Sequence, residues 1–223
     1  AMWKLLIPLF LMGYNPILIG MVTTIILVCL IIGLVYGIDR RSLAGIIGAL
    51  AGSIVTCFMA LFFVSRFKIH GAVMSYSEML LYSGYENLNL TEIFIASIFI
   101  ASSGAVMDVA VDITSAVAEV VEKKPDITRA EAIKSGINVG RSIMGTMMTT
   151  LLLAYSGGYI GLLMVFMAQG TPIINILNLK YVSSEILHTL VGSFGLITVA
   201  PFTAIASGIL LAERNNENET QIN

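Results

Sequence analysis

Asp108 and Asp112 stand one helical turn apart, directly after the apolar run IFIASIFIASSGAVM, and are the residues best suited to chemistry in this sequence. On a single α-helix, at about 100° per residue, they share one narrow face with small and acidic residues. The members of that face are Ser97, Ala101, Gly104, Asp108, Asp112, Ser115, Glu119 and Glu122. An ionisable side chain at bilayer depth faces a protein interior or a water-filled cavity, because its charged form is unfavourable in hydrocarbon. We therefore predict that this face is turned inward, onto a neighbouring helix.

The next helix, expected over about 129–155, carries a polar face of its own. Its members are Glu131, Asn138, Ser142, Gly145, Thr149 and Ser156. Because the connection between the two helices is short, we expect antiparallel neighbours with their polar faces opposed. Carboxylate, amide and hydroxyl oxygens suit a hard cation or a proton. The sequence thus predicts an ion or proton path, with polar contact between the helices as the alternative.

Two charged residues near this face have open roles. Arg141 either pairs with Asp108 or Asp112 across the helix interface or extends along its aliphatic stem to the cytoplasmic surface. Glu119 is a weaker candidate for the path, because the end of its helix is expected to lie solvated near the headgroups.

Glu185 and His188 lie one turn apart at the start of the last apolar segment. They are weaker candidates, either as a proton relay or as residues at the membrane interface. The chain has two histidines and lacks an HExxH motif, so we expect no metal site. It also lacks a phosphate-binding glycine loop and a nucleophile elbow. An intramembrane aspartyl enzyme would need acids on two helices, so we expect neither an enzyme nor a cofactor.

The composition sets the class of protein. Of 223 residues 57% are apolar and 12% are charged, and the mean hydropathy is +0.91; soluble domains average about 25% charged residues. Several apolar runs approach or exceed the length of about 20 residues that crosses a bilayer as a helix. We therefore predict an all-α polytopic transmembrane bundle in residues 1–212, followed by a disordered polar tail at 213–223.

The bundle should contain about five or six spans, with short re-entrant or interfacial segments. The expected spans are 17–36, 43–64, 93–122, 129–155 and 183–211. Whether the interrupted apolar stretch 159–179 crosses the membrane stays open, and with it the side of the C-terminus. Small residues let helix backbones approach closely. The glycines expected at such contacts are Gly48, Gly52, Gly104, Gly145, Gly192 and Gly195.

The distribution of Lys and Arg predicts the orientation and the partners. Basic residues gather in the loops near Arg40 and Lys123, which places these loops in the cytoplasm and the loop at Ser77 outside. The lipid bilayer is the expected environment, and the absence of a basic patch with interleaved aromatic residues argues against nucleic acid.

Several motifs resemble those of the YibE/F-like family of bacterial multi-pass membrane proteins. They are GAVMDVA at 104–110, GRSIMGT at 140–146, TLLLAY at 150–155 and PLFLMGYNP at 8–16, followed by Asn178, Glu185, LVG at 190–192 and Pro201. The resemblance covers nearly the whole chain and implies a bacterial cell-membrane location. It implies a permease or another membrane protein, and no defined substrate.

The sequence departs from the family pattern at three polar positions. Ser142 stands where the family has Asp, Thr149 where it has Asn, and Asp112 where it usually has a neutral residue. We hypothesise that this chain carries on one helix an acid that its relatives carry on the next.

Two functions follow from these observations. The first is a permease or transporter subunit with Asp108 and Asp112 on the path of an ion or proton. The second is a membrane scaffold, an assembly subunit beside a related YibE-like chain, without transport of its own. Six or fewer spans is a small number for a transporter. This favours a protein that works as a homo-oligomer or in a hetero-complex.

Overall fold

The computed structural model describes the backbone of residue 4 and residues 6–220, and side chains as far as residue 212. Every regular element in this described part is helical, which confirms the all-α prediction. The elements are α1 (Ile7–Leu11), α2 (Pro16–Tyr36), α3 (Arg40–Arg66), η2 (Gly71–Val73), α4 (Ser77–Tyr82), α5 (Leu90–Lys123), α6 (Arg129–Gly158), α7 (Ile160–Ala168), α8 (Ile173–Leu177) and α9 (Lys180–Thr220).

Capping residues start the two helices that carry the predicted path. The Asn89 side chain accepts a hydrogen bond from the Glu92 backbone N–H at 3.2 Å and begins α5. Thr128 and Glu131 form a reciprocal capping box at the start of α6. Such caps satisfy backbone N–H groups that have no partner within the helix, and both starts agree with the sequence pattern.

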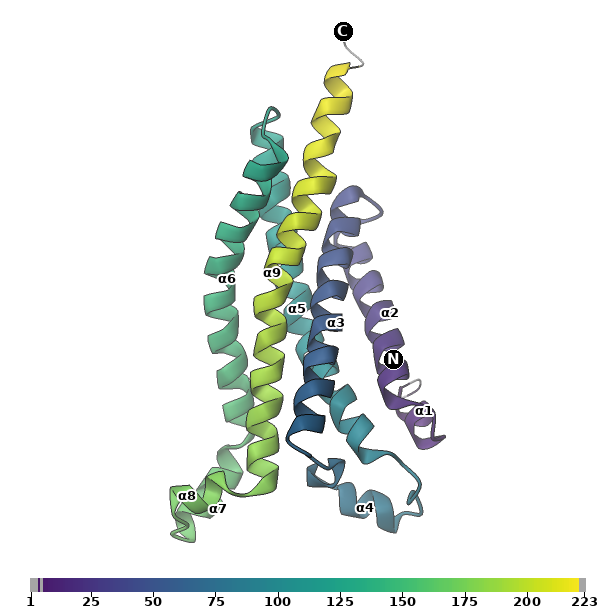
Figure 1. Ribbon diagram of the computed structural model, residues 1–223, viewed down its shortest axis with the longest axis vertical. Coiled ribbons are helices and arrows are strands. Elements are labelled where there is room, and N and C mark those ends of the chain that lie inside the picture. Colours follow the sequence, from purple (N-terminus) through teal and green to yellow (C-terminus); the bar gives the residue numbers. More distant parts are fainter. Residues whose placement is uncertain (1–3, 5, 221–223) are drawn as a thin grey trace.

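The long helices form an elongated bundle in which α9 packs along α3, α5 and α6 (Figure 1). Helix α5 also contacts α2 and α3, so it lies at the centre, with α2 and α6 towards the two sides. Outside the bundle, large apolar side chains such as Leu30, Phe58 and Leu153 are exposed. Surfaces of this kind face the acyl chains of a bilayer.

Helices α2, α3, α5 and α9 are each long and apolar enough to cross a membrane. Helix α6 adds a fifth span if it is counted together with α7, which bends away from it by 53°. The structure therefore has four or five candidate spans, where the sequence predicted about five or six.

The stretch 159–179 stays at one end of the bundle. Helix α7 has 9 residues and α8 has 5, and both lie where α6 ends and α9 begins (Figure 1). At 1.5 Å per residue, α7 is about 14 Å long, well short of the hydrocarbon layer of about 30 Å. Helix α9 consequently returns through the bundle, and its C-terminal end lies beside the α2–α3 and α5–α6 loops.

Helix α9 runs to Thr220 and so includes the first part of the polar tail at 213–223. The disorder of that tail stays a prediction. Residues 213–220 contain no glycine or proline, so nothing in the sequence interrupts the backbone hydrogen bonds of the helix. Residues 221–223 lie outside the described part of the chain.

Glycines place α3 and α9 in close contact. A methyl group on Gly48 would overlap Thr203, and one on Gly52 would lie 2.8 Å from Val199 Cβ. Gly195 faces Thr56 in the same interface. A methyl group on Gly192 would lie 3.4 Å from Ser102 Cβ of α5.

The remaining two predicted packing glycines, Gly104 and Gly145, have no atom of a neighbouring helix within 4 Å of an added Cβ. The prediction of helix packing at these two positions is therefore wrong within this chain. Both residues lie on helix faces that point out of the bundle.

Candidate functional site

The acidic face of α5 points outward. Gly104, Asp108, Asp112, Ser115 and Glu119, which we call the acidic strip, are all exposed. The opposite face of α5 is buried, and its members are Val106, Val109, Ala110, Ile113 and Val117. The prediction that the acids turn onto a neighbouring helix of the same chain is thus wrong. The apolar face packs against α3 and α9, and burying it leaves the acidic strip uncovered.

Helix α6 approaches α5 through small residues that the polar-face prediction left out. A methyl group on Gly140 would lie 2.8 Å from Ile113 Cδ1, and one on Gly136 would lie 2.8 Å from Val117 Cγ2. Ala132 is buried one turn earlier. This four-residue spacing of small residues is a known packing signal, and it identifies the contacting face of α6 from the sequence.

The polar face of α6 consequently points away from the bundle. Asn138, Ser142, Gly145 and Thr149 are all exposed, and Thr149 donates a hydrogen bond to the Thr146 carbonyl of its own helix at 2.8 Å. By helical periodicity, this outer face lies opposite the small residues that contact α5. The two polar faces therefore do not meet, in contrast to the prediction.

Arg141 lies level with Asp112, because the adjacent Gly140 contacts Ile113. None of the ion pairs between described residues involves Arg141, Asp108 or Asp112. All three side chains are exposed. The alternative in which Arg141 pairs with these acids is not found within the described chain.

Tyr36 shows how deep the acids lie. Its hydroxyl donates to the Val111 carbonyl and shares a hydrogen bond with Ser115 Oγ. Tyr36 is the last residue of α2, a helix of 21 residues that matches one bilayer crossing, and tyrosines favour the membrane interface. Asp112 is then about 5 Å, and Asp108 about 10 Å, deeper than Ser115.

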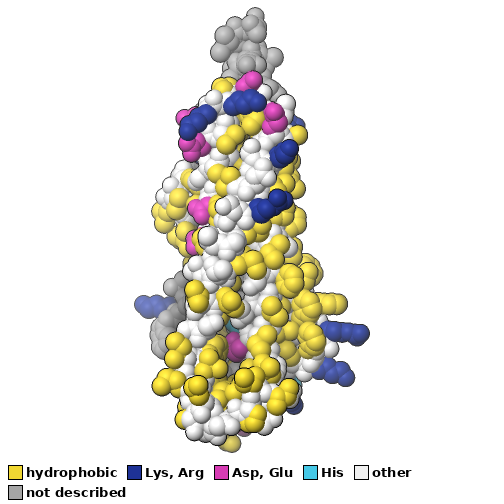
Figure 2. All heavy atoms as spheres, turned by 90° about the vertical axis from the view of Figure 1, so that its left-hand side faces the viewer, with side chains coloured by type: hydrophobic (Ala, Val, Ile, Leu, Met, Phe, Trp, Pro, Cys, Tyr) yellow, Lys and Arg dark blue, Asp and Glu magenta, His cyan; other side chains and the backbone are white. Residues whose placement is uncertain are grey.

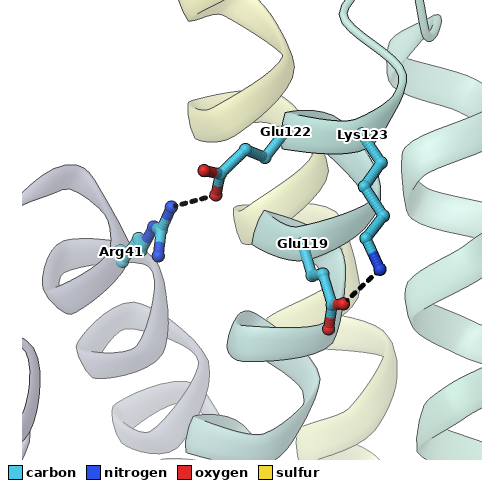
Figure 3. Close-up of polar contacts among 4 residues, drawn as sticks. All are labelled: Arg41, Glu119, Glu122 and Lys123. Atoms are coloured by element: carbon cyan, nitrogen blue, oxygen red, sulfur yellow. Dashed lines mark hydrogen bonds and ion pairs between the residues drawn. The ribbon is translucent and has the colours of Figure 1, made fainter.

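The other acids near the end of α5 have cationic partners (Figure 3). Glu122 accepts from Arg41 of α3 at 3.1 Å, and Glu119 accepts from Lys123 one turn on at 2.6 Å. The carboxylates of both residues are well exposed. Charged side chains of both signs gather at this end of the α6 side in Figure 2. Glu119 thus belongs to a solvated, paired end, and Asp108 and Asp112 lie apart from it.

A second cluster lies at the opposite end of the bundle, around the start of α9. Glu185 Oε2 is 3.5 Å from His188 Nδ1, and the two side chains are 27% and 11% exposed. Tyr159 lies close to Glu185 and lines the same cavity. The Tyr155 ring lies 5.4 Å from the His188 ring, and Phe94 contacts the same imidazole edge to face at 6.2 Å.

The two tyrosines of this cluster were not among the predicted site residues. Tyr155 and Tyr159 stand four residues apart at the end of α6, a spacing that places two side chains on one helix face. This spacing is the sequence signal that could have identified the pair of tyrosines. The structure therefore brings together Glu185 and His188, as their spacing suggested, and adds aromatic partners from another helix.

A family model describing YibE/F-like proteins matches residues 1–213. The chain belongs to the YibE/F-like family. No curated protein and no solved structure matches it. The resemblance noted in the sequence is thereby confirmed, and together with the long apolar helices it makes this YibE/F-like chain a membrane protein.

Proposed function

We propose that this YibE/F-like protein is a permease subunit in the bacterial plasma membrane, and that Asp108 and Asp112 line the path of a proton or small cation. The observation that supports this proposal is that Asp108 and Asp112 are uncovered on α5 and lie deeper along the bundle than the contact of Tyr36 with Ser115. We expect an assembly of chains to carry out the transport, because a single chain leaves the path open on one side.

An ionised aspartate at the centre of a lipid-exposed helix costs about 2.5–3.5 kcal/mol on insertion scales. Neither Asp108 nor Asp112 has an ion-pair partner among the described residues that would offset this cost. Water or another protein surface over the strip removes the cost, and a carboxylate held there can bind a cation or exchange a proton.

The glycines on the uncovered faces favour a protein partner over lipid. Gly104 on the acidic strip and Gly145 on the outer face of α6 leave space that no neighbouring helix fills. Such positions allow a helix of another chain to approach closely. A second copy or a related YibE-like chain placed there would close the path and supply polar groups such as those of Asn138, Ser142 and Thr149.

Proton flux into liposomes that contain the purified protein tests the proposal. Asp108→Asn should reduce the flux about tenfold or more, because the amide neither ionises nor binds a cation strongly. Glu119→Gln is the matched control, since it removes an acid from the same strip outside the hydrocarbon layer, and it should retain flux within about twofold. Undiminished flux in Asp108→Asn would contradict the proposal.

A scaffold without transport is the second candidate. The observation that favours it is the outer face of α6, which is polar, uncovered and rich in small residues, and needs no substrate to explain it. Wild-type protein that forms a stable complex, and shows no proton or cation flux above protein-free liposomes, would support this reading instead.

A further inference from the structure

A cavity of about 290 Å³ lies between α6, α7 and α9, at the end of the bundle opposite the basic loops. Its walls are mainly aromatic and aliphatic. Tyr155 and Tyr159 come from α6 and its end, Phe166 from α7, and Tyr181 from α9. The Phe166 and Tyr181 rings stack with centroids 6.3 Å apart and an interplanar angle of 25°. The surface on this part of the α6 side is largely hydrophobic, with an acidic side chain recessed in it (Figure 2).

Glu185 is the one acidic or basic residue among the described residues that line the cavity. Its carboxylate is about three-quarters buried, and Tyr159 lies close to it. His188 lies behind it, and the imidazole Nε2 is buried without a hydrogen-bond partner. The group on the cavity wall that can carry a formal negative charge is therefore the Glu185 carboxylate, in apolar surroundings.

Aromatic walls together with one carboxylate favour a particular class of ligand. Faces of tyrosine and phenylalanine rings attract cations, and the attraction is stronger where water is excluded. A largely buried carboxylate adds a full counter-charge. Apolar walls do not replace the hydration shell of Na⁺ or Mg²⁺, whereas they match an ammonium ion that carries hydrocarbon groups.

We propose that this cavity binds a compact organic ammonium ion, with Glu185 as its counter-ion and Tyr155, Tyr159 and Tyr181 as its aromatic wall. The volume is at the lower limit of small-molecule pockets, about 300–1,000 Å³, which limits the ligand to a small one. The site is separate from the acidic strip, and neither Asp108 nor Asp112 contributes to it. The proposal goes beyond the transport proposal and stands or falls independently.

Equilibrium dialysis of the full-length protein in detergent, with benzyltrimethylammonium as the probe, tests this site. We expect saturable binding, and binding at least about tenfold weaker for the uncharged analogue neopentylbenzene, which has the same shape. Equal binding of the two compounds would overturn the proposal, because the cavity would then be a general apolar pocket for lipid or detergent.

Two variants and a control locate the site. Glu185→Gln should weaken binding of the cation about tenfold or more and leave the neutral analogue unchanged. Tyr181→Leu removes one aromatic face and should weaken cation binding about threefold or more, which provides an independent test if Glu185→Gln does not fold. Glu92→Gln removes an acid at the start of α5 that does not line the cavity, and should bind as the wild type does. Wild-type affinity in Glu185→Gln and Tyr181→Leu, or no saturable binding by the wild-type protein, would also overturn the proposal.

Discussion

A methyl group added to Gly48 and one added to Gly145 meet different surroundings, although both glycines lie within long apolar helices. At Gly48 the new atom would lie 2.8 Å from the backbone Cα of Thr203, which no side-chain rotation relieves. At Gly145 it would meet open space. Residue type and spacing indicate that a glycine can allow two helices to pack closely. Which glycines lie at such a contact depends on the arrangement of the helices.

Gly48→Ala should therefore destabilise the protein, by about 1–3 kcal/mol, because α3 and α9 must move apart to admit the methyl group. Gly145→Ala should leave stability unchanged or slightly raised, since alanine favours helix formation more than glycine does. Thermal unfolding in detergent, followed by circular dichroism, measures both. A midpoint for Gly48→Ala equal to that of the wild type would contradict the close α3–α9 contact.

The two groups of candidate site residues also differ in how well the sequence predicts their surroundings. Glu185 and His188 stand on one turn, so their contact follows from local spacing alone. The surroundings of Asp108 and Asp112 depend on which side of α5 its neighbours occupy. Periodicity places both acids on one face, and it contains no information on what covers that face.

At the scale of the helices, hydropathy predicted most of the fold. The long apolar runs became α2, α3, α5 and α9, and Asn89 and Thr128 cap the starts of α5 and α6. The rotation of α6 differs from the prediction, because the small residues Gly136 and Gly140 contact α5 in place of the polar residues. In α6 the small residues contact α5 and the polar residues point outward.

The short helices α7 and α8 decide the path of the rest of the chain. Because neither is long enough to cross the membrane, α9 runs from the end near Tyr181 to the end that carries Lys123. The Lys and Arg residues in the loops at that second end predict that it is cytoplasmic. The C-terminal end of α9 should then be cytoplasmic as well.

A green fluorescent protein fused after the last residue tests this topology in bacterial cells, because it matures when it stays in the cytoplasm and not when it is exported through the general secretory route. The full-length fusion should fluoresce. A fusion truncated after Ser83, in the loop that follows α4, should be expressed without fluorescence. Two dark fusions would mean that 159–179 crosses the membrane, and a dark full-length fusion with a fluorescent Ser83 fusion would mean that the orientation is inverted.

At the scale of the whole molecule, one feature sets this chain apart from a self-contained bundle. Its apolar core is closed between α3, α5 and α9, while the acidic strip and the outer face of α6 remain open. A monomer in lipid would place both polar surfaces against acyl chains. The proposed transport therefore requires a water-filled path along the acidic strip, with another chain closing its outer side.

Labelling of a cysteine at Gly104 tests it most directly, because this residue lies one turn deeper than Asp108 on the same strip and has room for a side chain. The protein would carry Gly104→Cys with Cys29→Ala and Cys57→Ala, and would be reconstituted in liposomes. Leu30→Cys in the same background is the control, since Leu30 is an exposed apolar residue of α2. A charged, membrane-impermeant maleimide should label position 104 and leave position 30 unlabelled, because the reagent needs water. Failure to label position 104, with the thiol still reactive after the protein is unfolded, would contradict a water-filled path along the acidic strip.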